Sequence, residues 1–201
     1  MKVLIVGGSK GLGKYLASNV HNAETYMIAR SEQSDERISN FCIDVNPEKK
    51  PDYSCFDNIK FDIVVYLVSM WGESSSLKTD ELVDFMNVGP LGYLNLVNEL
   101  HSQESLGEKC SIVSIGSTAE MPDGTRYPAY SLSKKLLKDI SCQLQNIHQS
   151  YRFTHFTIGS IGQREEERIE YSSILEIINT LSKMDSNTYL SSMVIKSKLD
   201  M

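Results

Sequence analysis

Positive charge and long apolar runs are both scarce in this chain of 201 residues. Lys and Arg total 20 against 26 Asp and Glu, which leaves a net charge of −6 and no visible basic stripe, so a general nucleic-acid-binding protein is not expected. The longest strongly apolar run lies between Asp62 and Gly72 and is too short to span a bilayer. The N-terminal MKVLIVGG lacks the long apolar core and the cleavage site of a signal peptide, and it predicts a first strand instead. We therefore expect a cytoplasmic protein with neither a membrane nor nucleic acid as partner.

Cysteine and histidine are also few, with four of each. The cysteines have no metal-ligand spacing, and two of them, Cys42 and Cys110, fall in strand-like segments. Buried free thiols in a reducing compartment are therefore expected rather than disulfides or metal ligands. The histidines have no ligand spacing either, and we expect all four to be structural or exposed: His21, His101, His148 and His155.

Apolar segments alternate between strand and helix patterns along the whole chain. Hydrophobic content of 41% and charged content of 23% fit a globular protein, and the length favours one domain over residues 1–201. Strands are predicted at 2–6, 25–29, 40–45, 61–68, 109–115, 152–158 and 188–195, and helices at 12–20, 80–103, 128–148 and 172–184. This order predicts a three-layer α/β fold with a mostly parallel, seven-stranded, doubly wound sheet, in which the very apolar 61–68 is central.

The first strand runs directly into a glycine-rich turn and then a helix. Glycines at 7, 11 and 13 permit a tight turn and a close approach of the backbone to a ligand. The helix N-terminus then offers free N–H groups to a pyrophosphate, although the spacing is neither G-x-G-x-x-G nor that of a P-loop. Arg30 and Ser31 follow the second strand where a carboxylate would select a free ribose 2′-hydroxyl, and Lys10 adds a second cation. Basic residues there favour a 2′-phosphate, so NADP(H) is expected over NAD(H).

A second chemical stretch runs from residue 111 to 135. A strand ends at Ser117, and Tyr130 and Lys134 lie four apart on one face of the helix that Pro128 begins. The ammonium is expected to lower the pKa of the phenol, and the serine hydroxyl could hold a carbonyl oxygen beside it. Tyr-x-x-x-Lys alone is a weak signal, because a helix surface with a solvated lysine gives the same spacing.

Together these motifs resemble the short-chain dehydrogenase/reductase family over roughly residues 2 to 163. Val6–Gly13 is similar to the Thr-Gly-x-x-x-Gly-Ile/Leu-Gly cofactor loop, Asp44-Val45 to the Asp-Val pair that meets the adenine, and Asn87 to the active-site asparagine. Ser117, Tyr130 and Lys134 match the family's serine, tyrosine and lysine, with the usual thirteen-residue step from Ser117 to Tyr130.

The resemblance implies a Rossmann fold and an NADP(H)-dependent oxidoreductase that interconverts a carbonyl and an alcohol on a small molecule. Tyr130 would donate the proton, Lys134 would assist it and bind the nicotinamide ribose, Ser117 would orient the carbonyl, and Asn87 would hold a water. The implied cofactor contacts are Gly7, Ser9, Lys10, Gly11, Leu12, Gly13, Arg30, Ser31, Asp44, Val45, Val68, Ser69, Met70, Tyr130, Lys134, Gly159 and Ile161.

Three departures from the family pattern concern the substrate side. Ser69-Met70-Trp71-Gly72 stands where Asn-Asn-Ala-Gly is usual, Ile158-Gly159 replaces Pro-Gly, and the lid is reduced to about residues 160–170. Trp71 and Met70 fit a substrate pocket or ordinary core packing equally well. An NADP(H)-binding regulatory or partner-binding protein with little turnover is the alternative, and turnover on a panel of carbonyls separates the two.

The helices at 80–103 and 128–148 carry apolar residues on more than one face. Six of those in the first helix cannot all face the sheet: Leu82, Phe85, Met86, Leu94, Leu96 and Val97. A symmetric helix-on-helix interface would cover the surplus, so a homodimer or homotetramer is expected. The segment Gly89-Pro90-Leu91-Gly92 is expected to bend the first helix.

Overall fold

Seven parallel strands form one sheet in the computed structural model, which describes residues 1–31, 33–71, 77–121, 127–162, 168–185 and 188–200. The strand order is β3-β2-β1-β4-β5-β6-β7, so the chain winds outward in both directions from the β1–β4 pair. The predicted doubly wound Rossmann-type fold is confirmed, and β4 is the central strand as expected. The strands are β1 (Lys2–Val6), β2 (Glu24–Ala29), β3 (Ile38–Cys42), β4 (Phe61–Tyr66), β5 (Leu106–Ile115), β6 (Arg152–Ile158) and β7 (Ser192–Ile195).

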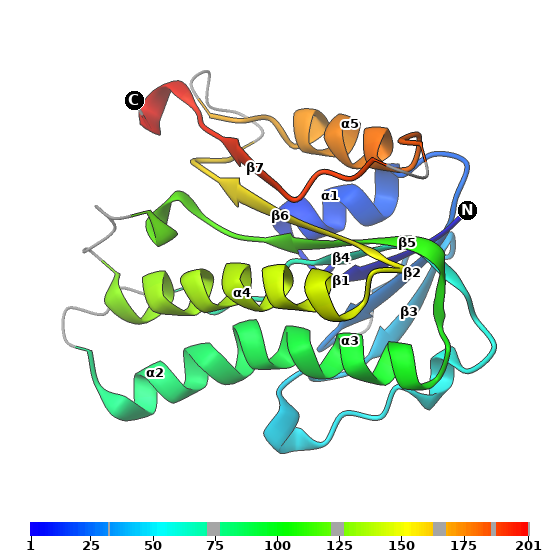
Figure 1. Ribbon diagram of the computed structural model, residues 1–201, viewed down its shortest axis with the longest axis horizontal. Helices are drawn as coiled ribbons and strands as arrows, with labels where there is room; N and C mark the ends of the chain where they lie inside the picture. Colours follow the sequence, from blue (N-terminus) through cyan, green and yellow to red (C-terminus); the bar gives the residue numbers. More distant parts are fainter. Residues whose placement is uncertain (32, 72–76, 122–126, 163–167, 186–187, 201) are drawn as a thin grey trace.

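Helices cover both faces of the sheet (Figure 1). On one face lie α1 (Gly11–Asn19) and α5 (Tyr171–Leu181), which contact each other. On the other lie α2 (Thr79–Met86), α3 (Gly92–Ser102) and α4 (Pro128–Ile147). Four short 3-10 turns complete the described elements: η1 (Pro47–Lys49), η2 (Ser54–Phe56), η4 (Thr118–Glu120) and η5 (Lys198–Asp200).

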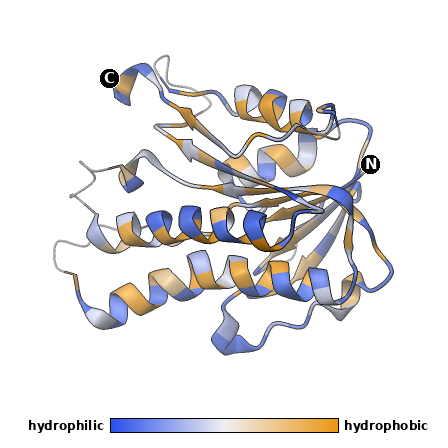
Figure 2. Cartoon of the chain, in the orientation of Figure 1, coloured by the Kyte–Doolittle hydropathy of each residue, from blue (hydrophilic) through white to orange (hydrophobic). Residues whose placement is uncertain are grey.

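Alternation along the strands divides the core in two. In β1, Leu4 and Val6 pack with α3 and α4, whereas Val3 and Ile5 pack with α1 and α5. A strand buried on both faces has to be apolar at every position, which explains the unbroken apolar runs in the sequence. Figure 2 shows the hydrophobic strands enclosed between helices that alternate hydrophobic and hydrophilic stripes.

The predicted helix at 80–103 is interrupted by a π-helical turn, η3 (Asn87–Leu91), between α2 and α3. Pro90 lies inside this turn and has no N–H to donate, so a regular α-helical ladder cannot continue through it. The Val88 carbonyl instead accepts a hydrogen bond from the Tyr66 hydroxyl, 2.6 Å away. The helix is therefore interrupted where the sequence predicted a bend, and the Tyr66 hydrogen bond joins the turn to the central strand.

The third strand was predicted too late in the chain. It spans Ile38–Cys42 rather than residues 40–45, so Asp44 and Val45 lie after it in the loop that follows. Because β3 is the edge of the sheet, Cys42 is exposed, and the expectation that it is buried is wrong, whereas Cys110 is buried as expected. All four cysteines are free.

The described residues contain neither a membrane-spanning helix nor a metal-binding cluster. None of their helices combines the length and apolarity needed to cross a bilayer. In the same parts of the chain, no group of three or more His, Cys, Asp or Glu side chains is placed to hold a metal ion.

Candidate functional site

A cleft of about 1590 Å³ follows the carboxyl edge of the sheet. Segments that come directly after β1, β2, β4, β5 and β6 all contribute to its walls, as do residues of α4. Open parallel sheets bind their ligands at this edge, where the winding direction reverses. The cleft takes in every predicted site residue except Ser31 and Asn87.

The glycine turn forms one end of the cleft. Gly7 has φ +94°, a conformation that disfavours any residue with a Cβ, and a Cβ there would also lie 3.0 Å from the Val68 side chain. Helix α1 begins at Gly11 with no side-chain cap and no acidic residue in its first turn. Its first N–H groups are therefore available to an anion, and the helix dipole favours one. This donor set fits the pyrophosphate of a dinucleotide.

Two cations lie near this end of the cleft. Lys10 and Arg30 both line it and are both exposed. Asp44 and Val45 line the neighbouring wall, with Val45 buried and Asp44 accepting a hydrogen bond from the Asn46 N–H at 3.1 Å. Ser31 is exposed, outside the cleft, and its hydroxyl accepts from the Gln33 amide at 3.3 Å.

Ser117, Tyr130 and Lys134 meet at the other end. Ser117 is the N-cap of η4, directly after β5, and its hydroxyl accepts from the Ala119 N–H at 3.2 Å. Tyr130 and Lys134 lie in the first two turns of α4 and are both buried. The Lys134 ammonium donates to the Ile115 carbonyl at 2.8 Å and lies 5.6 Å from the centre of the Tyr130 ring. The structure therefore brings these three residues together in one cleft, and their catalytic roles stay a prediction.

The predicted lowering of the Tyr130 pKa is wrong for the protein without ligand. Burial raises the pKa of this phenol, a hydrogen bond with Ser117 lowers it, the negative charge of Glu120 raises it, and the net shift is upward. Burial also lowers the pKa of Lys134 to about 8, although Glu120 opposes this. Desolvation disfavours the charged form of each group, an effect that residue spacing alone does not reveal.

Asn87 lies behind the cleft wall rather than on it. It is buried in the π turn, and Val88 reaches the cleft in its place. Its side-chain nitrogen has no hydrogen-bond partner among the residues that the structure describes. A buried amide of this kind normally bonds to protein or water, so its position fits the predicted water-holding role.

Trp71 is a solvent-exposed aromatic residue in the same cleft as Ser117, Tyr130 and Lys134. Its side chain is 70% exposed, which excludes core packing. The centre of its ring lies 5.1 Å from those of Tyr127 and Tyr130, and all three residues line the cleft. Of the two interpretations, the substrate pocket fits this position. Gly72 and residues 163–167 of the predicted lid lie outside the described residues.

Sequence reasoning missed three acidic or basic groups next to this site. Glu120 and His155 form a buried pair below Ser117, and the Ser-x-x-Glu spacing of a capping box at 117–120 was an available signal. Asp200 accepts a hydrogen bond from the Ser160 N–H at 3.0 Å and lines the cleft. It lies beyond the region of family resemblance, and no local pattern pointed to it.

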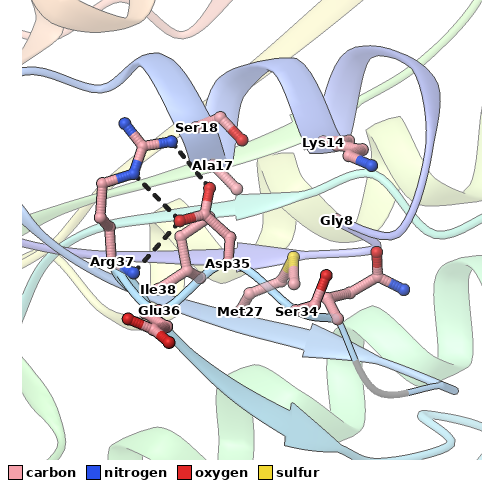
Figure 3. Close-up of a pocket in the computed structure, with 11 residues that line it drawn as sticks. Gly8, Lys14, Ala17, Ser18, Met27, Ser34, Asp35, Glu36, Arg37 and Ile38 are labelled. Atoms are coloured by element: carbon pink, nitrogen blue, oxygen red, sulfur yellow. Dashed lines mark hydrogen bonds and ion pairs between the residues drawn. The ribbon is translucent and has the colours of Figure 1, made fainter.

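A second cavity, of about 490 Å³, lies under α1 beside the segment that joins β2 to β3 (Figure 3). Asp35 and Arg37 form an ion pair there at 2.8 Å, and Lys14 lies across the cavity. None of the predicted catalytic or cofactor-binding residues lines it. We therefore assign the site to the larger cleft.

Solved structures with this architecture are numerous. A short-chain dehydrogenase family protein from Francisella tularensis superposes with a TM-score of 0.81 at 18% identity, covering 97% of this chain and 96% of that one. Serine dehydrogenase from Escherichia coli gives 0.78 at 15% identity over 100% and 99% of the two chains. A 4-hydroxyisoleucine dehydrogenase complexed with NADH gives 0.77 at 17% identity over 97% and 96%. This chain has the fold of these dehydrogenases. No protein-family model and no curated protein matches the sequence.

Proposed function

We propose that this chain is an NADP(H)-dependent oxidoreductase that interconverts a carbonyl and an alcohol on a small molecule. One observation carries the proposal: Ser117, Tyr130 and Lys134 share a single cleft with the glycine turn and two cations. The cleft has a dinucleotide end and a proton-donating end, as a hydride-transfer enzyme requires. The similarity to dehydrogenase structures supports the fold on which this rests.

The cofactor would lie along the carboxyl edge of the sheet. The turn at Gly7–Gly13 and the N-terminus of α1 would hold its pyrophosphate, and Asp44 and Val45 would meet the adenine. Val68, Ser69 and Met70 would follow its ribose, with Gly159 and Ile161 at the nicotinamide. When bound, the nicotinamide supplies or accepts the hydride.

The side chains of the chain itself would handle the proton. Tyr130 donates its phenolic proton to the substrate oxygen, and the Ser117 hydroxyl holds that oxygen in place. Lys134 carries three N–H donors, so it can bond to the cofactor ribose as well as to the Ile115 carbonyl. Asn87 holds a water that returns a proton toward Lys134. The raised pKa of Tyr130 keeps the phenol protonated at neutral pH, which favours the reductive direction.

We infer a preference for NADP(H) over NAD(H) from Lys10 and Arg30. No acidic residue ends β2, and Arg30 stands at the position that decides between a 2′-hydroxyl and a 2′-phosphate. One solved relative by fold was crystallised with NADH, so the fold alone is compatible with either cofactor. The preference is therefore a property of these two side chains.

The remaining features of the proposal concern the whole protein. We propose a single cytoplasmic domain over residues 1–201 that acts on a small molecule and associates as a homodimer or homotetramer. Trp71 and Tyr127 would form an aromatic wall for the substrate beside Tyr130.

Turnover tests the proposal directly. Purified protein with NADPH is incubated with a panel of aldehydes and ketones, and nicotinamide absorbance is followed. Oxidation of NADPH that depends on a carbonyl substrate supports the enzyme. Tight NADPH binding in calorimetry with no turnover on any carbonyl supports the alternative, a regulatory or partner-binding protein.

A further inference from the structure

A buried hydrogen-bonded pair, Glu120 and His155, lies next to the turn that carries Ser117. The Glu120 and His155 side chains are 3% and 2% exposed, and His155 Nε2 lies 3.1 Å from both carboxylate oxygens. On its other side, His155 Nδ1 lies 2.8 Å from the Ser114 hydroxyl, and the Thr157 hydroxyl donates to Glu120. The network joins β5, β6 and η4. In the arrangement that satisfies every group, Ser114 donates to Nδ1 and Nε2–H donates to the carboxylate.

Glu120 is ionised in this network. Burial raises the pKa of its carboxyl, but hydrogen bonds from His155, Thr157 and the Ser117 backbone outweigh burial and lower the pKa. A buried carboxylate normally requires this kind of compensation. Glu120 therefore carries a fixed negative charge next to Ser117, outside the lining of the cleft.

The same carboxylate fixes the Ser117 turn. It accepts from the Ser117 N–H at 3.3 Å and so closes a capping box over η4. The Ala119 carbonyl in that turn accepts from the Ser131 hydroxyl at 2.6 Å, which ties the turn to α4 next to Tyr130. Gly116 makes room for the pair, because a Cβ there would lie 2.2 Å from His155 Nε2 and 2.5 Å from Glu120 Oε2.

Among the described residues, His155 of β6 is the titratable group that contacts Glu120 directly. Tyr130 and Lys134 lie on α4, which the Ser131–Ala119 hydrogen bond ties to the same turn. The negative charge of Glu120 raises the pKa of both Tyr130 and Lys134, because it disfavours a phenolate and favours an ammonium. One buried carboxylate therefore acts on two of the residues proposed for proton transfer.

We propose that Glu120, held by His155 and Thr157, is a positioning residue that fixes the Ser117 turn and sets the pH range over which Tyr130 and Lys134 work. This rests on the proposed function for its consequence in turnover, but the charge effect itself is measurable without turnover. Glu120 does not line the cleft, and it acts through Ser117, Tyr130 and Lys134, which do.

The test removes the charge of Glu120 and keeps the shape of its side chain. Tyrosinate absorbance is followed against pH in the parent and in Glu120→Gln. Each titration is compared with that of the same protein carrying Tyr130→Phe, so that the difference contains the Tyr130 phenol alone. The Tyr130 midpoint is expected to fall by roughly 1 pH unit in E120Q, because a like charge near a titrating acid has an effect of that order. The high-pH limb of the reductive kcat/KM profile should fall with it.

Thr157→Val is the matched control, since it removes one hydrogen bond but leaves the Glu120 charge. It should leave the Tyr130 midpoint in place. If E120Q does not fold, as circular dichroism would show, the double variant Glu120→Gln with His155→Gln replaces the carboxylate and the neutral imidazole with two amides and should give the same fall. An unchanged midpoint in the neutral variants, or an equal fall in T157V, overturns the proposal. Absence of turnover in the parent protein overturns the proposed function instead.

Discussion

Burial, a hydrogen bond and a nearby charge all shift the pKa of Tyr130. Its proposed role as proton donor depends on its single hydroxyl. Removing that oxygen with Tyr130→Phe leaves the ring in contact with Phe85 and Trp71. We expect reduction to fall by ~10²–10⁴-fold, the usual contribution of general acid catalysis, with NADPH binding nearly unchanged. Steady-state kinetics on a confirmed substrate and calorimetry measure the two effects. Retention of most of the rate would remove Tyr130 from the mechanism.

The proposed preference for NADP(H) depends on a second single residue, Arg30. Hydrogen bonds to charged groups contribute ~1.5–3 kcal/mol, so one arginine–phosphate contact should give NADPH roughly tenfold tighter binding than NADH. Arg30→Asp should reverse the order, because a carboxylate repels the phosphate and accepts from a free 2′-hydroxyl. Calorimetric titration with both cofactors measures this.

Lys10→Ala is the companion variant. It should weaken NADPH and leave NADH little changed, since the partner lost is the phosphate alone. The preference should also shrink with added salt, because both cations are exposed. Equal affinities, or tighter NADH in the parent, would contradict the role given to both cations.

Lys134 should leave a signature in the pH dependence of stability. Its pKa is lowered from an ordinary 10.5 to about 8 in the folded protein, so the unfolded chain holds more protons between these values. The free energy of unfolding therefore rises with pH across this window for the parent, and below pH 8 the full cost of burying the ammonium is present. Lys134→Met lacks this rise. Its stability relative to the parent should decline as pH increases from 8 to 10.5, as urea unfolding at several pH values would show; a constant difference would argue against the lowered pKa.

At the scale of elements, the π turn between α2 and α3 depends on close packing at Gly92. A Cβ there would lie 2.6 Å from the Tyr66 hydroxyl and 3.0 Å from the Val45 carbonyl, and the backbone carbonyl cannot move freely. Gly92→Ala should therefore destabilise the protein by about 1–3 kcal/mol, the usual cost of overpacking. Gly89→Ala in the same turn is the control, because its Cβ would lie 3.9 Å from Ser133 in ordinary contact. Equal urea midpoints for the two variants would contradict this account of the turn.

How far the sequence predicts each element follows from what determines it. β1 was predicted with its observed bounds because four consecutive buried residues are apolar, and β6 because Phe153, Phe156 and Ile158 stand among β-branched threonines. β3 was misplaced because in this edge strand Ile38 alone is buried, and the apolar signal continues past its end to Val45.

The residues of the candidate site differ in the same way in how far the sequence predicts them. The glycine turn and the three residues Ser117, Tyr130 and Lys134 were predictable because they lie close together in sequence or follow strand ends. The Glu120–His155 pair was not, because it joins residues 35 apart in the sequence, and the upward shift of the Tyr130 pKa was not, because burial is its largest cause. Distance along the chain and desolvation are the two properties that sequence patterns carry least.

At the scale of the whole molecule, the apolar surplus on the helices is only partly used within the chain. Phe85 of α2 packs against Ala129 and Tyr130 of α4, which accounts for one of the residues that could not face the sheet. Val83 on α2 and Leu132 on α4 nevertheless remain 44% and 37% exposed. The two helices contact each other on the same face of the sheet (Figure 1), and we propose that their exposed apolar residues bind a second copy.

Association through this surface is the last prediction. Light scattering at micromolar concentration should give a dimer or tetramer rather than a monomer of 22.6 kDa. Val83→Glu combined with Leu132→Glu should produce that monomer, because two buried charges per subunit would lack partners in a symmetric interface. Leu199→Glu is the matched control: Leu199 is 51% exposed but lies in η5, on the other side of the sheet from α2. If the parent protein is a monomer, another partner would have to cover the exposed apolar residues of α2 and α4. Dissociation by L199E alone would place the interface at the η5 end of the molecule.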